Sequence, residues 1–188
     1  MNGEMVAEMT AEDAFEQHQH EQEVALTSTA TIVGQAITCG GWSLALNLNW
    51  TNTIIDVFEL VKIPRSPNWL IGAVNVDGNI IPVVDLSVYF VPNAPPMQID
   101  RHHRLLVGGK RDASIESTAG SGSDGVFAIL FAGLPMQIDY TQEVIDETIV
   151  IPERLRELCI GTAKDSSGKT YFELNTDRFI EFLSLSLI

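Results

Sequence analysis

Two apolar runs separated by a two-residue turn form the clearest pattern of hydrophobic and polar positions in this chain. Residues 70–86 are mostly apolar on both sides of Asp77 and Gly78. Asp-Gly is a preferred pair for a type I′ turn, in which both central residues have positive φ. The pattern therefore predicts a tight β-hairpin with Asp77 and Gly78 at its tip.

Short β-strands are also predicted on both sides of this hairpin. Trp42–Asn49 alternates apolar and polar residues, which is typical of a strand with one buried face. Gly40 and Gly41 supply a turn before it, and Pro64 and Pro67 interrupt regular pairing before the hairpin. The other predicted strands are Thr31–Thr38, Ile54–Val61, Arg104–Gly109 and Val126–Phe131.

Helical patterns are confined to two segments in the C-terminal part of the chain. Residues Arg178–Leu185 are amphipathic, and Pro152–Leu158 begins with a proline suited to a first helical turn. Asp85 and Asn175 each precede a short helical or turn segment and are predicted to cap it through their side-chain oxygens. The alternative for Asp85 is a catalytic base at the end of an apolar strand.

The layout around the hairpin recurs about ninety residues later. Ile63-Pro64 precedes Gly72 by nine positions, and Ile151-Pro152 precedes Gly161 by ten. The later correspondences are Gly78 with Gly168, Asp85 with Asn175, and Tyr89-Phe90 with Phe179-Ile180. Two copies favour a pair of small β subdomains, because a solenoid needs three or more.

Composition narrows the possible functions. The 188 residues are 45% apolar, which is enough for one domain with a core. A formal net charge of −14 argues against nucleic-acid binding, which requires Lys and Arg to neutralise phosphates. The sequence contains no apolar run of the roughly 18 residues that a membrane span needs, and its start lacks the pattern of a signal peptide. We expect a cytosolic protein without membrane insertion.

The N-terminal residues and the cysteines give no sign of a metal or disulfide framework. Residues 1–25 are rich in acidic side chains and poor in large apolar ones, so we expect a disordered tail. His18 and His20 within it do not share a helical face, which argues against a metal site. Cys39 and Cys159 lie far apart and are expected to be buried structural thiols.

No recognisable catalytic motif is present. The Gly- and Ser-rich stretch Ala113–Gly125 could be a phosphate cradle, but it lacks a Gly-Lys-Ser/Thr ending and precedes a predicted strand, so a hairpin connection is favoured. His102 and His103 could supply a base, yet neighbouring residues on a strand point to opposite faces. We expect no catalytic residues, no cofactor and no metal.

The hairpin and its flanks resemble the CheW-like chemotaxis coupling proteins. That family has an aliphatic residue before a proline-containing segment, then an aromatic residue, G-x-x-N-x-x-G and a strand ending in D-L. The matching residues are Ile63, Pro67, Trp69, Gly72, Asn75, Gly78, Pro82, Asp85 and Leu86. The resemblance extends more weakly over roughly residues 28–185.

The resemblance implies a mainly β fold with two five-stranded SH3-like barrels that share a core, plus a short C-terminal helix. We expect the CheW-like domain to cover residues 26–188. Its first barrel would occupy about 40–100 and its second about 101–188, with strands partly exchanged between them.

The resemblance also implies a non-catalytic adaptor. Its partners would be the cytoplasmic tip of a methyl-accepting chemoreceptor and the regulatory domain of a CheA-like histidine kinase, so the protein would be recruited to membrane-associated receptor arrays. The alternative is a free-standing SH3-like module that binds a small ligand or an unrelated protein.

Two departures from the family pattern concern the expected contact residues. Many members read N-L-R-G at the hairpin, whereas this chain has Asn75-Val76-Asp77-Gly78, so the charge is reversed. The glutamate common in the preceding strand is replaced by Thr53. We expect partner contacts at Thr51, Thr53, Asn75, Val76, Asp77 and Gly78, and a specialised coupling protein, for example in a type IV pilus (twitching) system.

Overall fold

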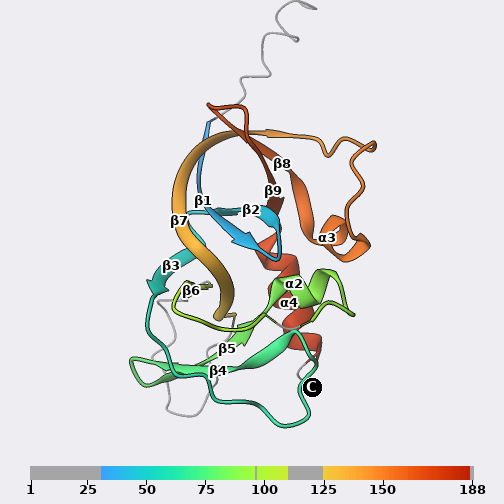
Figure 1. Cartoon of the computed structure of the whole chain (residues 1–188). Coiled ribbons are helices and arrows are strands. Elements are labelled where there is room, and N and C mark those ends of the chain that lie inside the picture. The colour runs from blue at the N-terminus through green and yellow to red at the C-terminus, as the bar shows by residue number, and fades with distance from the viewer. Residues whose placement is uncertain (1–30, 96, 110–124, 187–188) are drawn as a thin grey trace, which may run out of the picture. The chain divides into compact units, whose positions relative to one another are not determined.

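The computed structural model describes residues 31–95, 97–109 and 125–186, and these residues are mainly β (Figure 1). The predicted fold class is thereby confirmed. The strands are β1 (Ile32–Cys39), β2 (Trp42–Asn47), β3 (Thr51–Ile55), β4 (Leu70–Val76), β5 (Asn79–Val84), β6 (His103–Gly108), β7 (Phe127–Glu143), β8 (Cys159–Asp165) and β9 (Thr170–Leu174). The helices are α2 (Leu86–Phe90), α3 (Glu153–Leu158) and α4 (Thr176–Ser186).

One group of strands closes on itself. β1 pairs with β2, β2 with β9, β9 with β8, and β8 with the C-terminal part of β7. That part of β7 pairs in turn with β1, from Tyr140 opposite Ile32 to Met136 opposite Ala36. We call this closed group the C-terminal barrel.

The second group contains the predicted hairpin. β4 pairs with β5, β5 runs parallel to the N-terminal part of β7, and β6 joins β7 to β3. Between β3 and β4 the connection is a single bridge from Val61 to Ala73. We call this group the N-terminal barrel; the two groups are consistent with the two barrels that the sequence predicts.

The internal repeat explains how the strands are shared. β1 to β5 and α2 correspond in order to β6, the two parts of β7, β8, β9 and α4. The N-terminal barrel combines β3, β4 and β5 of the first copy with β6 and the beginning of β7 from the second. The C-terminal barrel combines the end of β7, β8 and β9 with β1 and β2. Each barrel therefore contains strands of both copies, and β7 bends from one to the other (Figure 1).

Alternating side chains divide the apolar interior into three clusters. The interior of the N-terminal barrel contains Val74, Ile81, Val83, Leu105, Val107, Ala128 and Leu130. The interior of the C-terminal barrel contains Ala36, Ala45, Ile138, Tyr140, Ala163 and Tyr171. The largest cluster, the inter-barrel core, draws on strands of both barrels and on all three helices, with members such as Leu46, Leu106, Phe131, Tyr89 and Phe179.

Gly72 and Gly161 occupy equivalent places in the two copies. Each lies at a register shift, where one strand of its hairpin carries an extra residue. A Cβ atom would lie 2.5 Å from the carbonyl oxygen of Val61 at Gly72, and 2.5 Å from that of Glu143 at Gly161. Both glycines are therefore required because another backbone segment approaches closely. The sequence repeat shows that glycine recurs at this position, but it does not give this reason.

The predicted caps are also equivalent. Asp85 is the N-cap residue of α2, and its Oδ1 accepts hydrogen bonds from the backbone N–H groups of Ser87 (2.9 Å) and Val88 (3.4 Å). Its Oδ2 accepts from the N–H of Met97 at 3.3 Å. At the start of α4, Asn175 Oδ1 accepts from the N–H of Arg178 at 3.0 Å. Asp85 is fully buried with its carboxylate committed to these donors, which argues for the cap and against the catalytic base.

The predicted strand Ile54–Val61 is wrong in its extent. β3 begins earlier, at Thr51, and ends at Ile55; residues 56–60 are irregular and Val61 makes only an isolated bridge. The apolar spacing of this segment fits a strand, but the chain must leave β6 and cross to the edge of β4. Tertiary pairing therefore overrides the local pattern.

The predicted strand Val126–Phe131 continues much further, to Glu143. Gly133 and Pro135 lie within this extension, although glycine and proline usually interrupt strands. In the structure Gly133 has φ 84°, which lets β7 bend, and pairing with β1 and β8 then extends it.

Two smaller predictions are also corrected. β2 was expected to bury one face, but Ala45 is buried as well as Leu44 and Leu46, because β2 lies between two apolar clusters. Pro152 stands at the N-cap of α3 and not in its first turn.

Two expectations fall on parts of the chain outside the described residues. They are the acidic tail, including His18 and His20, and the Gly- and Ser-rich stretch except for Gly125.

The two caps give a matched test of stability. Asp85→Ala leaves four donors without an acceptor, namely the N–H groups of Ser87, Val88 and Met97 and the hydroxyl of Ser87. We therefore expect a loss of about 2–3 kcal/mol in the free energy of unfolding. Asn175→Ala removes a single hydrogen bond, which is exposed to solvent, and should lower the free energy of unfolding by about 1 kcal/mol. Urea titrations followed by circular dichroism measure both, and equal losses would contradict the assigned difference.

Candidate functional site

The hairpin tip has the geometry that the sequence predicts. Asp77 has φ 52° and Gly78 has φ 86°, the positive values of a type I′ turn. The Asn75 Oδ1 atom accepts a hydrogen bond from the Gly78 N–H at 2.8 Å. Asn75 and Gly78 therefore build the turn, which leaves the exposed Asp77 side chain as its variable, charged feature.

Thr51 and Thr53 lie on β3, which pairs with β6 through Thr51 opposite Gly108 and Thr53 opposite Val107. β3 and the hairpin are at opposite ends of the pairing order in the N-terminal barrel, with β6 and β7 between them. The Thr53 side chain is exposed, whereas the Thr51 hydroxyl is buried and has no hydrogen-bond partner among the described residues. The predicted contact residues therefore lie on two groups of strands that do not pair directly with each other.

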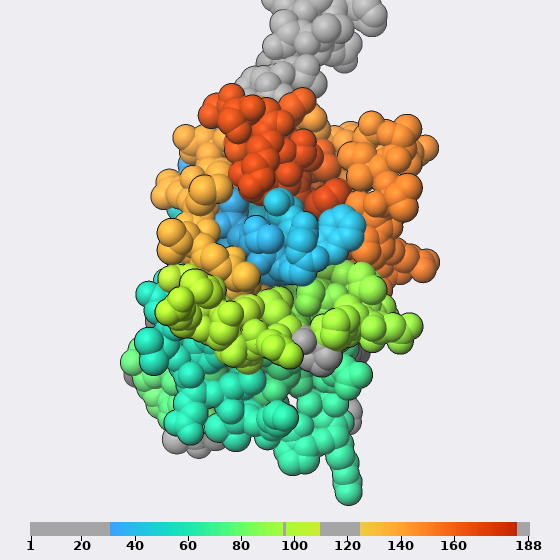
Figure 2. Space-filling view, in the orientation of Figure 1, coloured from blue at the N-terminus to red at the C-terminus, as the bar shows by residue number. Residues whose placement is uncertain are grey.

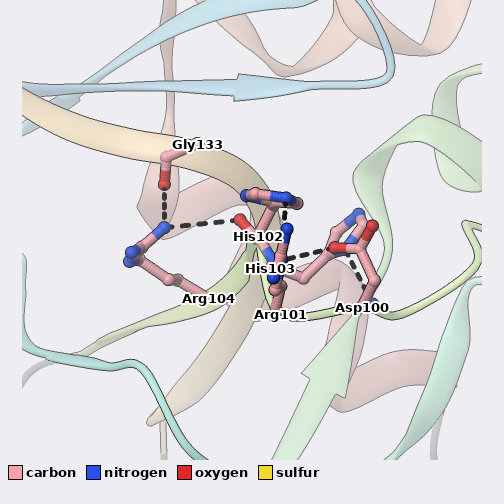
Figure 3. Close-up of polar contacts among 6 residues, drawn as sticks. All are labelled: Asp100, Arg101, His102, His103, Arg104 and Gly133. Carbon is pink, nitrogen blue, oxygen red and sulfur yellow. Dashed lines mark hydrogen bonds and ion pairs between the residues drawn. The ribbon is translucent and has the colours of Figure 1, made fainter.

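Arg104 joins the two barrels where β7 bends. Its Nε atom donates to Asp56 Oδ1 at 2.7 Å, just after β3. Its Nη1 atom donates to the carbonyl oxygen of Gly133 at 2.6 Å and to that of His102 at 3.4 Å (Figure 3). We call this arrangement of Arg104, Asp56 and Gly133 the Arg104 bridge.

Large apolar side chains are exposed at the residues that follow Asp56 and Gly133 in the sequence. Val57, the residue after Asp56, is 91% exposed, and Leu134, the residue after Gly133, is 76% exposed. Ile54, two residues before Asp56, and Met136, three residues after Gly133, are also exposed. A contiguous patch of exposed apolar residues is typical of a protein-binding surface. Sequence reasoning missed these residues, because Val57 was placed in a regular strand and Leu134 lies beyond the predicted strand Val126–Phe131.

The two histidines are placed differently. His103 is buried, and its Nδ1 atom lies 2.9 Å from Asp100 Oδ1. His102 is exposed and accepts a hydrogen bond from Arg101 Nε at 3.4 Å (Figure 3). Neither contact ties a histidine to a serine or cysteine nucleophile.

Both cysteines are buried thiols in the described structure. Burial raises the pKa of Cys159 to about 12, with Arg156 lowering it and Glu173 raising it to a lesser extent. Burial, assisted by the nearby Asp85 carboxylate, raises the pKa of Cys39 well above its ordinary value. Since the thiolate is the reactive form, neither cysteine is suited to nucleophilic chemistry.

Metal-ligating side chains do not cluster in groups of three or more within the part of the chain that the structure describes. Among the same residues, no helix has the length and apolar character needed to cross a membrane.

The described residues thus form a mainly β domain whose strands fall into two groups around a shared core. A family model, the CheW-like domain, matches residues 34–183. The chain therefore belongs to the CheW-like domain family.

A solved structure agrees on the fold. It is that of the scaffolding protein TtCheW from Thermoanaerobacter tengcongensis, which is 15% identical to this chain with a TM-score of 0.59. The match covers 78% of this chain and 90% of TtCheW. No curated protein sequence matches this chain.

The Arg104 bridge predicts a specific effect on stability. Arg104→Gln should lower the free energy of unfolding by about 1 kcal/mol, because the carbonyl of Gly133 loses a charged donor while the exposed ion pair to Asp56 adds little. Arg101→Gln is the matched control, since Arg101 is exposed and donates a long hydrogen bond of 3.4 Å to its neighbour His102. Thermal unfolding of both variants measures the difference, and equal stabilities would argue against the bridge.

The thiol environments predict slow chemical labelling. At pH 8 both cysteines should be protonated and covered, so a disulfide reagent such as dithionitrobenzoate should react only after unfolding. The time course in buffer and in concentrated urea measures this. Rapid reaction of the folded protein would contradict the burial of Cys39 and Cys159.

Proposed function

We propose that this protein is a non-catalytic adaptor that couples chemoreceptors to a CheA-type histidine kinase. Membership of the CheW-like family supports a scaffolding role, and the buried thiols and committed Asp85 carboxylate give no support to catalysis. The observation that carries the proposal is the presence of two distinct exposed surfaces on one double-barrel domain.

The first proposed surface is the tip of the β4–β5 hairpin. It would bind the regulatory domain of the kinase through Asn75, Val76, Asp77 and Gly78. The turn is held by the bond from the Gly78 N–H to Asn75, so Asp77 can change partner preference without changing the backbone. Ile80 on β5, opposite Asn75, is 64% exposed and extends this surface with apolar area.

The second proposed surface is the exposed apolar group at the Arg104 bridge, together with Thr53 on β3. It would bind the helical cytoplasmic tip of a methyl-accepting chemoreceptor. Val57 and Leu134 come from the two barrels and flank the bridge, so an amphipathic helix could place apolar side chains against both. The protein would then be recruited to membrane-associated receptor arrays from the cytoplasm.

We further infer that the coupling is specialised, for example to a type IV pilus (twitching) system. Asp77 stands where many family members have arginine. A reversed charge at an interface weakens binding to a partner that is complementary to arginine. A cognate kinase would then present a basic side chain to Asp77. The alternative of a free-standing SH3-like module would bind neither partner.

Charge reversal at the hairpin tests the first surface. Asp77→Arg should weaken binding of the regulatory domain of the cognate kinase by about tenfold or more, because a favourable charge pair becomes a repulsion. Ser166→Arg places the same side chain at the exposed tip of the equivalent β8–β9 hairpin and should bind as the wild type does. Isothermal titration calorimetry measures both, and unchanged binding by Asp77→Arg would remove the hairpin from the contact.

Loss of exposed apolar area tests the second surface. Leu134→Ser should weaken binding of a receptor cytoplasmic fragment by about tenfold, while binding of the kinase domain stays unchanged. Val150→Ser is the control, because Val150 is 94% exposed but lies between β7 and α3. If neither protein binds the wild type, the adaptor proposal fails and the binding-module alternative gains support.

A further inference from the structure

A hollow of about 430 Å³ lies where the β1–β2 turn meets α2 and the start of β6. Its walls include Gly41, Trp42, Ser87, Val91, His103 and Ala132, so both barrels contribute. Figure 2 shows the blue β1–β2 segment directly against the yellow-green residues that lead into β6. The volume falls within the usual range of pockets for small molecules.

We propose that this hollow is a binding site for a small, uncharged aromatic molecule that carries one hydroxyl or amide group. This site goes beyond the adaptor function and uses neither of its two proposed surfaces. The proposal rests on the aromatic wall, the buried histidine and the lack of charged side chains in the lining.

Trp42 supplies the aromatic wall. It is only partly buried, and the edge-to-face contact with Phe172, with ring centroids 5.9 Å apart, holds the indole in place. Aromatic rings stack favourably on such a fixed indole. Val91 and Ala132 add apolar surface to the same hollow.

His103 supplies the polar group. It is 8% exposed and lines the hollow. Its Nδ1 atom lies 3.0 Å from the Asp100 backbone nitrogen and 2.9 Å from Asp100 Oδ1 (Figure 3). An unprotonated Nδ1 accepts from the Asp100 N–H, and a protonated Nδ1 donates to the carboxylate. In either tautomer Asp100 orients the ring through Nδ1, which leaves Nε2 as the nitrogen that can bond a ligand.

Among the described residues that line the hollow, none is Asp, Glu, Lys or Arg. A charged ligand would lose its hydration without gaining a counter-charge, whereas an uncharged one would not. The net charge of the chain, −14, disfavours anions further. These facts together select a neutral ligand.

The walls are also fixed before any ligand arrives. Asp85 holds the beginning of α2 through the backbone of Ser87 and Val88. Gly40 packs so closely on Ser87 that a Cβ atom would lie 2.2 Å from the Ser87 Cβ. Preorganised walls of this kind reduce the entropy cost of binding.

The test uses 2-naphthol and naphthalene as probes of the full-length protein, followed by two-dimensional NMR. We expect saturable shifts at the residues of the hollow and about tenfold tighter binding of 2-naphthol than of naphthalene. Ala94→Trp should weaken 2-naphthol about tenfold by filling the hollow, while Val150→Trp, which adds the same side chain at an exposed loop position, should not.

His103→Leu tests the polar contact separately. This variant should bind both probes equally, because the hydroxyl loses its partner while the apolar contacts remain. The proposal is overturned if the probes shift no residue of the hollow, if Ala94→Trp binds like the wild type, or if His103→Leu keeps the preference for 2-naphthol.

Discussion

The inter-barrel core is the packing interaction on which the rest of this structure depends. The interior of the N-terminal barrel is aliphatic and that of the C-terminal barrel contains two tyrosines, Tyr140 and Tyr171, whereas the cluster between the barrels contains most of the other buried aromatic residues. Phe179 of α4 contacts Phe127 of β7 and Tyr89 of α2, with ring centroids 4.9 and 5.6 Å apart. Because burial of aromatic side chains contributes strongly to core energetics, the contact between the two barrels is a major source of stabilisation.

Strand exchange between the two copies reinforces this dependence. The N-terminal barrel needs β6 and the beginning of β7 from the second copy, and the C-terminal barrel needs β1 and β2 from the first. Neither copy can complete its own set of strand pairs, so the two copies must fold together. β7 belongs to both barrels. The Arg104 bridge binds β7 at Gly133, where the strand passes from one barrel to the other.

This architecture suits an adaptor. A scaffold has to present surfaces at fixed positions, and a shared core fixes two barrels more firmly than a flexible linker would. The hairpin tip and the apolar group beside the Arg104 bridge lie on such a framework, and their side chains can vary while the backbone stays the same. The walls of the hollow near Trp42 and His103 come from both barrels, so the shared core also fixes their relative positions.

Local chemistry determined several features from the sequence alone. The type I′ turn at Asp77-Gly78, the caps at Asp85 and Asn175 and the order of the repeated elements depend on contacts within a few residues, so their patterns are readable. The resemblance carried by Gly72, Asn75 and Gly78 indicated the family for the same reason, since these residues build the hairpin.

Only the tertiary structure decided the features that join distant segments. The early end of β3, the length of β7 beyond Gly133, the Arg104 bridge and the hollow all depend on residues far apart in the chain. Val57 and Leu134 have unremarkable sequence surroundings, and their exposure follows from where β3 and β7 stop pairing. The chain's own pattern specifies its local elements, but which strand edges meet is set by the packing of two exchanged barrels on one core.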